Sequence, residues 1–179
     1  MGQYVADPGM IRRDTQAAGL AVAGWAAIGT GGAAFGLAGQ SGMAAELSAA
    51  FGLYGTSRGN EIERILSRVF SGGLPRTFPT IDRFLNGVAT SVKSFDLGGK
   101  TYQNAARLGS TINGFVDKLR DFSGGQVGRF AVDGKDVTVR VLEIVVQSSK
   151  LTEGQAMAIA EAGKRAQELG VVIRVIAVR

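Results

Sequence analysis

The last third of the chain constrains the fold most, because two β-branched runs there flank one helix-length segment. Residues 137–146 (VTVRVLEIVV) are mostly apolar and β-branched, and residues 171–178 (VVIRVIAV) repeat that character. Between them, residues 151–169 predict a helix that Thr152 opens and Gly170 closes. A strand, a helix and a strand at this spacing form a βαβ crossover, which requires parallel strands and a right-handed connection. The sequence therefore predicts an α/β sheet.

Further elements are predicted before this crossover. They are, in order, a helix over residues 58–70 (RGNEIERILSRVF), extended runs around 78–84 and 88–95, and a helix over about 102–122. Ser57 is the expected cap of the first helix. The pair Asn86-Gly87 joins the two extended runs and is a strong hairpin signal. The expected order is helix, hairpin, helix, strand, helix, strand around a mixed sheet flanked by helices.

The chain divides near residue 55. Residues 15–45 carry no charged side chain and are dominated by Ala and Gly. This stretch exceeds the roughly 20 residues that span a bilayer, but frequent glycine weakens a helix by about 1 kcal/mol per residue relative to alanine. We expect residues 1–55 to form an apolar, helical leader for delivery, entry or linkage, and residues 56–179 to form the functional domain. Two interpretations of residues 15–45 stay open: a segment that contacts a membrane or a chaperone, and an ordinary helical linker.

The sequence contains neither histidine nor cysteine. This absence excludes an imidazole base, a histidine-bound metal, a thiolate nucleophile and a cysteine-ligated zinc. Residues 1–55 contain two basic and three acidic side chains, a sum of −1, whereas residues 56–179 contain 18 basic and 12 acidic ones, a sum of +6. The basic second part suits a polyanionic partner, with a solvated basic surface as the alternative.

Glu63, Asp82 and Lys93 form the candidate site. Strand alternation places Ser91 and Lys93 on the same side, and the Asn-Gly turn brings their strand beside Asp82. Two neighbouring carboxylates repel each other unless a cation is bound, so Glu63 and Asp82 predict a divalent ion, Mg²⁺ first, with Mn²⁺ or Zn²⁺ as alternatives. Such an ion activates water and polarises a phosphoryl oxygen, while Lys93 orients or deprotonates the water or neutralises developing charge.

Three sequence strings carry a family resemblance: RGNEIE, LPRTFPTIDRFLNGVATSVKSFDL and KTYQNAARL. Through them the chain resembles the PD-(D/E)XK nuclease superfamily, and more closely the C-terminal toxin domains of bacterial polymorphic and contact-dependent growth inhibition toxins, including tRNases. The resemblance implies a PD-(D/E)XK-like mixed β-sheet, with Glu63 as the helical acid, Asp82 as the motif aspartate and Lys93 as the motif lysine. Ser91 stands where the motif has Asp or Glu, so cation binding must depend more on Glu63, Asp82, backbone carbonyl and water.

The resemblance also implies a function. It predicts a metal-dependent endonuclease toxin that hydrolyses phosphodiester bonds in RNA, above all tRNA, in competing bacteria. Such a toxin is secreted as part of a larger protein, acts in the target-cell cytoplasm and has an immunity protein, which we expect to be acidic because the nuclease domain is basic. The alternatives are a DNase toxin of the same fold, a membrane-active toxin acting through residues 15–45, and a nucleic-acid-binding module without catalysis.

Several polar residues are candidates for contacting the phosphates or bases of a substrate. They are Arg58, Arg76, Lys100, Tyr102, Gln103 and Arg107. Each also has a structural interpretation, because single surface cations are commonly solvated and a tyrosine suits a core or a cap. Asp96 is expected either to pair with Lys93 or to hold the following loop. Glu61 competes with Glu63, but the two lie about 200 degrees apart on a helix and cannot both face the site.

Overall fold

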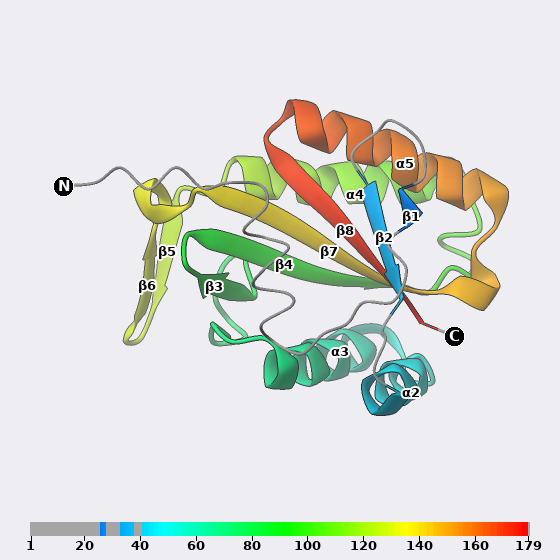
Figure 1. Ribbon diagram of the computed structural model, residues 1–179, viewed down its shortest axis with the longest axis horizontal. Helices are drawn as coiled ribbons and strands as arrows, with labels where there is room; N and C mark the ends of the chain where they lie inside the picture. The colour runs from blue at the N-terminus through cyan, green and yellow to red at the C-terminus, as the bar shows by residue number, and fades with distance from the viewer. Residues whose placement is uncertain (1–25, 28–32, 38–40, 179) are drawn as a thin grey trace.

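The computed structural model describes residues 26–27, 33–37 and 41–178, which form a mixed sheet between two layers of helices (Figure 1). The sheet has the strand order β1-β2-β8-β7-β4-β3. Its strands are β1 (Ala26–Ala27), β2 (Ala33–Leu37), β3 (Arg83–Leu85), β4 (Val88–Phe95), β7 (Val139–Gln147) and β8 (Val171–Val178). The helices are α2 (Ser41–Ala50), α3 (Gly55–Val69), α4 (Ala105–Arg120) and α5 (Glu153–Glu168). Figure 1 shows α4 and α5 on one face of the sheet and α2 and α3 on the other.

The predicted βαβ crossover is confirmed. Strands β7 and β8 are parallel neighbours, and α5 connects them. Thr152 caps α5, and its side chain and that of Gln155 form a reciprocal capping box. Strands β4 and β2 are also parallel to their neighbours β7 and β8, whereas the outer strands β3 and β1 run antiparallel. The sheet is therefore mixed, as the sequence predicts.

The central strand β7 is buried on both faces. Leu142, Ile144 and Val146 pack into the core beneath α4 and α5. Val145 packs on the other face, in a second cluster with residues of α2 and α3. Burial on both sides explains why residues 137–146 read as a nearly continuous apolar run.

The predicted hairpin is present, but its first strand is shorter than expected. Asn86 and Gly87 both have positive φ, 49° and 80°, as a tight turn between antiparallel strands requires. Residues 78–82 were expected to be extended with the rest of the strand, yet β3 comprises only Arg83–Leu85. Pro79 has no backbone N–H to donate, and Thr80 has a φ of 68°, so neither continues a strand.

The helix starts also differ from the prediction. Helix α3 begins at Gly55 with Tyr54 as its N-cap, so the expected Ser57 cap is wrong. The N–H of Ser57 instead donates to the carbonyl of Tyr54. Helix α4 begins at Ala105 rather than near 102, because the side chain of Asn104 accepts from the N–H of Arg107 and caps it.

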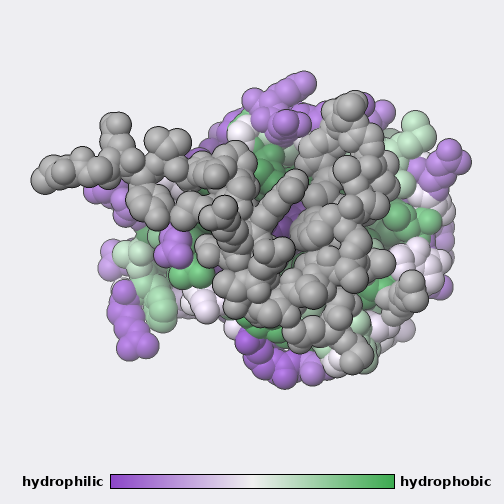
Figure 2. Space-filling view, viewed as in Figure 1, coloured by the Kyte–Doolittle hydropathy of each residue, from purple (hydrophilic) through white to green (hydrophobic). Residues whose placement is uncertain are grey.

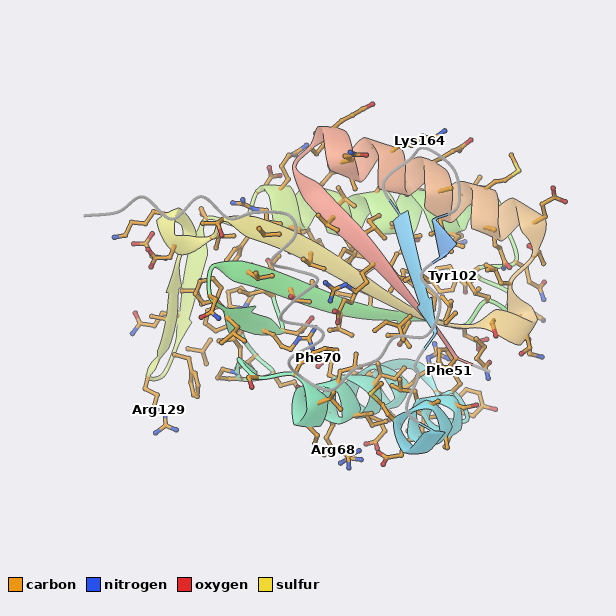
Figure 3. All side chains as sticks on the ribbon, viewed as in Figure 1. Phe51, Arg68, Phe70, Tyr102, Arg129 and Lys164 are labelled. Atoms are coloured by element: carbon orange, nitrogen blue, oxygen red, sulfur yellow. The ribbon has the colours of Figure 1, made fainter. Side chains whose placement is uncertain are left out.

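One element has no counterpart in the prediction. Strands β5 (Gly124–Val127) and β6 (Phe130–Asp133) form a separate two-stranded antiparallel sheet, which projects from the body in Figure 1. Figure 2 shows hydrophobic surface on this projection, and Figure 3 places Arg129 at its tip. These strands are four residues each, with β5 mostly half-buried and β6 mostly exposed, and no apolar alternation marked them in the sequence. Short 3-10 turns, Gly134–Asp136 and Ser148–Lys150, flank β7.

The expectation of a helical leader is wrong for part of the described chain. Ala26–Ala27 and Ala33–Leu37 are strands, and only Ser41–Ala50 is helical. The outer edge of β8 offers backbone groups that β2 pairs, and the glycine-rich sequence has little helix propensity to oppose this pairing. Most of residues 15–45 lies outside the described residues, including most of the stretch expected to contact a membrane or chaperone. No helix that the structure describes is long and apolar enough to span a bilayer.

Helix α2 packs on the rest of the molecule. Leu47 and Ala50 are buried in a cluster with Ile62 and Ile65 of α3. The helix that precedes residue 55 thus shares a core with the segment that follows it. The division of the chain into parts at residues 1–55 and 56–179 stays a prediction.

Candidate active site

The candidate site lies just before the first residue of β3, where one edge of β4 has no strand partner in the described part of the chain. β3 pairs only with residues 88–90 of β4. Just before β3, Asp82 donates its N–H to the carbonyl of Thr90 at 2.8 Å. The next donor along this edge, the N–H of Val92, is satisfied by Asp82 Oδ2 at 2.6 Å. Because β3 begins only at Arg83, the Asp82 carboxylate can accept the Val92 N–H in place of a strand carbonyl.

Two side chains of β4 converge on the same carboxylate oxygen. Ser91 Oγ and Lys93 Nζ each lie 3.3 Å from Asp82 Oδ2. Lys93 Nζ also donates to the carbonyl of Val92 at 2.8 Å. Ser91 is buried, whereas the Asp82 and Lys93 side chains retain 21% and 26% of their exposure, so a ligand can reach them. The structure therefore brings together the aspartate, serine and lysine that the sequence singled out.

Glu63 of α3 lies close enough to this cluster for the charges of Asp82 and Lys93 to act on it. Burial raises the pKa of Glu63, the nearby Asp82 carboxylate raises it further, and Lys93 and Arg76 oppose the shift. Glu61 lies elsewhere, because it pairs with Arg64 on the exposed side of α3, and the hydrogen bond from that arginine lowers the pKa of Glu61. Of the two competing glutamates, Glu63 is the one beside Asp82.

The donor set suits a hard cation that keeps part of its water shell. Among the residues that the structure describes, no group of three or more acidic side chains is placed to hold a metal ion. Glu63 and Asp82 supply two carboxylates, and the hydrogen bonds to Asp82 all fall on Oδ2. Mg²⁺ is commonly held by one or two carboxylates with several waters. Burial first and the Asp82 carboxylate second raise the pKa of Glu63, and a cation would offset the second cause. The residues present therefore fit such an ion.

Arg58, a predicted phosphate contact, has a structural role in its observed position. Its side chain is 11% exposed, its guanidinium pairs with Asp96 at 3.4 Å, and it lies over the Phe51 ring at 5.6 Å. Asp96 was expected either to pair with Lys93 or to hold the following loop, and the structure pairs it with Arg58. These contacts join the start of α3 to the end of β4 and leave little of Arg58 for a substrate.

The other predicted substrate contacts fall into three groups. Arg76 is exposed and lies near enough to Glu63 to affect its pKa, so it borders the site. Tyr102 packs edge-on against Phe95, with ring centres 5.0 Å apart, and Gln103 donates to the carbonyl of Gly98. Lys100 and Arg107 are exposed. Their roles in substrate binding stay predictions.

A buried ionic triad beside the site was not predicted as a functional group. Glu143 of β7 is fully buried, and its carboxylate accepts from Arg83 of β3 and, at 2.8 Å, from Arg174 of β8. Arg83 directly follows Asp82, and Glu143 is the register partner of Val92. The triad therefore ties the hairpin that carries the site to the central strands. The one feature of the sequence that could have indicated the triad is a glutamate, Glu143, inside the apolar run of residues 137–146.

The fold and the cluster together define a class of protein. A helical acid, an aspartate at the entry to a hairpin and a lysine on its second strand, all on a mixed sheet between helices, are the features of a PD-(D/E)XK nuclease. The model of the family described as the CDI toxin restriction endonuclease-like domain matches residues 58–176, and the chain belongs to this family of contact-dependent growth inhibition toxins.

A solved structure has a similar fold. It is a CdiA-CT/CdiI toxin and immunity complex from Yersinia pseudotuberculosis, with a TM-score of 0.56 and 23% sequence identity. The match covers 65% of this chain and 98% of that one. No curated protein matches the chain. The predicted fold class and family are thereby confirmed.

Proposed function

We propose that this chain is a metal-dependent endonuclease toxin whose active site is the Glu63–Asp82–Ser91–Lys93 cluster. The observation that carries the proposal is the contact of Lys93 Nζ with Asp82 Oδ2 at 3.3 Å, with Glu63 half-buried beside them. A lysine and a carboxylate at an open sheet edge, with a second carboxylate on the neighbouring helix α3, can supply charge stabilisation and cation binding without histidine.

Each residue of the cluster has a distinct task in the proposed reaction. Glu63 and Asp82 hold the divalent cation, Mg²⁺ first, which when bound supplies a Lewis acid and a water of lowered pKa. Lys93 orients the attacking water and neutralises charge that develops on the phosphate oxygens. Ser91 and the Val92 N–H hold the Asp82 carboxylate in place through Oδ2. Ser91 thereby contributes a positioning hydrogen bond where the motif has a carboxylate.

The substrate is a phosphodiester polymer, with two candidates. The sequence resemblance favoured tRNA. The family description names a restriction endonuclease-like domain and specifies no substrate, so DNA stays the alternative. The sum of +6 over residues 56–179 suits either polymer. Both therefore enter the test.

The decisive experiment is cleavage by the whole chain. The protein is incubated with tRNA, total RNA and plasmid DNA, with Mg²⁺, Mn²⁺, Zn²⁺ or EDTA, and the product ends are sequenced. Cleavage should require a divalent ion and should fall by about 10²-fold or more in Lys93→Ala and Asp82→Asn. Lys164→Ala, an exposed lysine on α5, is the matched control. Undiminished cleavage or toxicity in Lys93→Ala and Asp82→Asn would overturn the site assignment.

We also infer a protein partner and a route of action. The Yersinia toxin was solved with its immunity protein, and for this chain we propose an acidic immunity protein in the producing cell, since opposite charge speeds association. The chain acts in the target-cell cytoplasm after delivery as part of a larger secreted toxin. An acidic protein from the producing strain should bind the chain and stop cleavage, and binding should weaken as salt rises.

A further inference from the structure

Helix α4 places a second lysine beside the candidate site. The Phe115 ring has Lys93 Nζ 5.6 Å from its centre and Lys118 Nζ 5.7 Å from the same centre. Phe115 is partly buried and packs edge-on against Phe95 at 6.3 Å, so the ring is held by the core. Lys93 and Lys118 therefore both make cation–π contacts with one ring, Phe115, whose position is fixed by the core.

Lys118 has no acidic partner among the described residues. Asp121, one turn further along the chain, pairs with Arg120. Asp117, the preceding residue, pairs with Arg120 and with Arg165 of α5. The acids that could neutralise Lys118 locally are thus engaged by arginines, and an exposed ammonium is left next to the cluster.

The distance between the ammonium nitrogens of Lys118 and Lys93 corresponds to a few nucleotides along a nucleic-acid strand. The two distances to the Phe115 centre put the ammonium nitrogens at most about 11 Å apart. One strand of duplex DNA advances about 3.4 Å per nucleotide, so this separation corresponds to no more than about three nucleotide steps. Arg76 borders the cluster near Glu63. Cations thus border the cluster both near Glu63 and near Phe115.

We propose that Lys118, supported by Phe115, binds a backbone phosphate of the nucleic acid within about three nucleotides of the bond that is cut. Phe115 holds the ammonium in place, and the ligand is a phosphodiester of either RNA or DNA. The contact positions the strand across the open edge of β4 and does not read bases. This inference rests on the proposed nuclease function and adds the path of the substrate to it.

The test measures binding and cleavage separately. Binding of a fluorescent duplex DNA and of a fluorescent tRNA is measured in EDTA between about 50 and 200 mM salt, where no metal-dependent cleavage interferes. Lys118→Ala should weaken binding about fivefold and reduce the slope of log affinity against log salt by about 0.9 on the duplex. Lys118→Arg should restore both. The matched control is Lys164→Ala, another exposed helical lysine, which Figure 3 places on α5 at the outer edge of the molecule.

Kinetics with a divalent ion completes the test. In Lys118→Ala the loss should appear in KM rather than in kcat, because the contact is remote from the reacting atoms. If the parent cuts but Lys118→Ala binds with unchanged affinity and salt slope, the inference is wrong and the nuclease function stands. If the parent does not cut but binds with a slope that depends on Lys118, the phosphate contact stands and the nuclease function falls. If the parent neither binds nor cuts, both fail.

Discussion

Replacing Glu143 with glutamine should destabilise the protein severely, although glutamine has nearly the same shape. Glu143 is fully buried and neutralises two guanidiniums, those of Arg83 and Arg174, whose side chains are 6% and 18% exposed. Without the carboxylate, two positive charges remain in the interior next to each other. Removing one partner of a buried ion pair costs about 3–5 kcal/mol, because the remaining charge is neither hydrated nor paired.

That cost is a large part of the total stability. Domains unfold with a free energy of about 5–15 kcal/mol, and for a chain of this size each 1 kcal/mol shifts the melting temperature by about 2–4 °C. Glu143→Gln should therefore lower the melting temperature by roughly 10 °C. Urea unfolding followed by circular dichroism measures the free energy of unfolding directly, provided that its slope against urea is unchanged.

Two controls separate charge from shape. Arg68→Gln removes an exposed ion pair with Glu46 and should leave the unfolding midpoint unchanged within error, because exposed pairs contribute little. A triple variant with Met, Leu and Met at Arg83, Glu143 and Arg174 removes the charges together and should be far more stable than Glu143→Gln. If the free energy of unfolding of Glu143→Gln lies within about 1 kcal/mol of that of the parent, the triad does not stabilise the fold by charge pairing.

Three further predictions follow from the geometry. Burial and Asp82 raise the pKa of Glu63, so the folded state favours its neutral form and loses stability as the pH rises through that pKa. In EDTA, Glu63→Gln should thus unfold at higher urea than the parent above this pH, and equal stability at pH 8 would contradict the assignment. Ser91→Asp restores the motif carboxylate next to Asp82, so it should lower the melting temperature in EDTA and enlarge the increase in melting temperature that Mg²⁺ causes. A thermal shift series in which Mg²⁺ stabilises the variant no more than the parent would argue against a cation site. Gly87→Ala should lower the free energy of unfolding by about 1–3 kcal/mol, because Gly87 has a φ of 80° and an added Cβ would lie 2.5 Å from Thr138 Oγ1. Gly59→Ala in α3, where an added Cβ meets no atom of the described residues within 4 Å, is the control and should not destabilise the protein. Chemical unfolding of the two variants measures both effects.

The fold was predictable where its signals are local. The β-branched runs, the Thr152 cap and the Asn86-Gly87 turn each lie within a few consecutive residues, and each of these predicted features is present. The strand expected over residues 78–84 failed because Thr80 adopts a positive φ that no preceding pattern announced. The β5–β6 hairpin was missed because its short strands carry no apolar alternation.

The candidate site was predictable because most of it lies on one hairpin. Asp82, Ser91 and Lys93 are close in sequence, so strand alternation and a tight turn were enough to bring them together. The choice of Glu63 over Glu61 depended on which side of α3 faces the sheet, and the apolar positions Ile62, Ile65 and Leu66 define that side. The contacts of Arg58 could not be predicted, because nothing near it in the sequence shows that Asp96 and Phe51 lie against it.

The sequence by itself determined the parallel crossover, the hairpin and a chemistry limited to carboxylate, hydroxyl and lysine, because these depend on local pattern and on the absence of histidine and cysteine. Tertiary structure alone decided the remaining features. It added β2 to the edge of β8, gave Glu143 two arginines from β3 and β8, and placed Lys118 on the ring that also contacts Lys93. Each of these contacts joins residues on different elements, so it exists only once the sheet and its helices have packed.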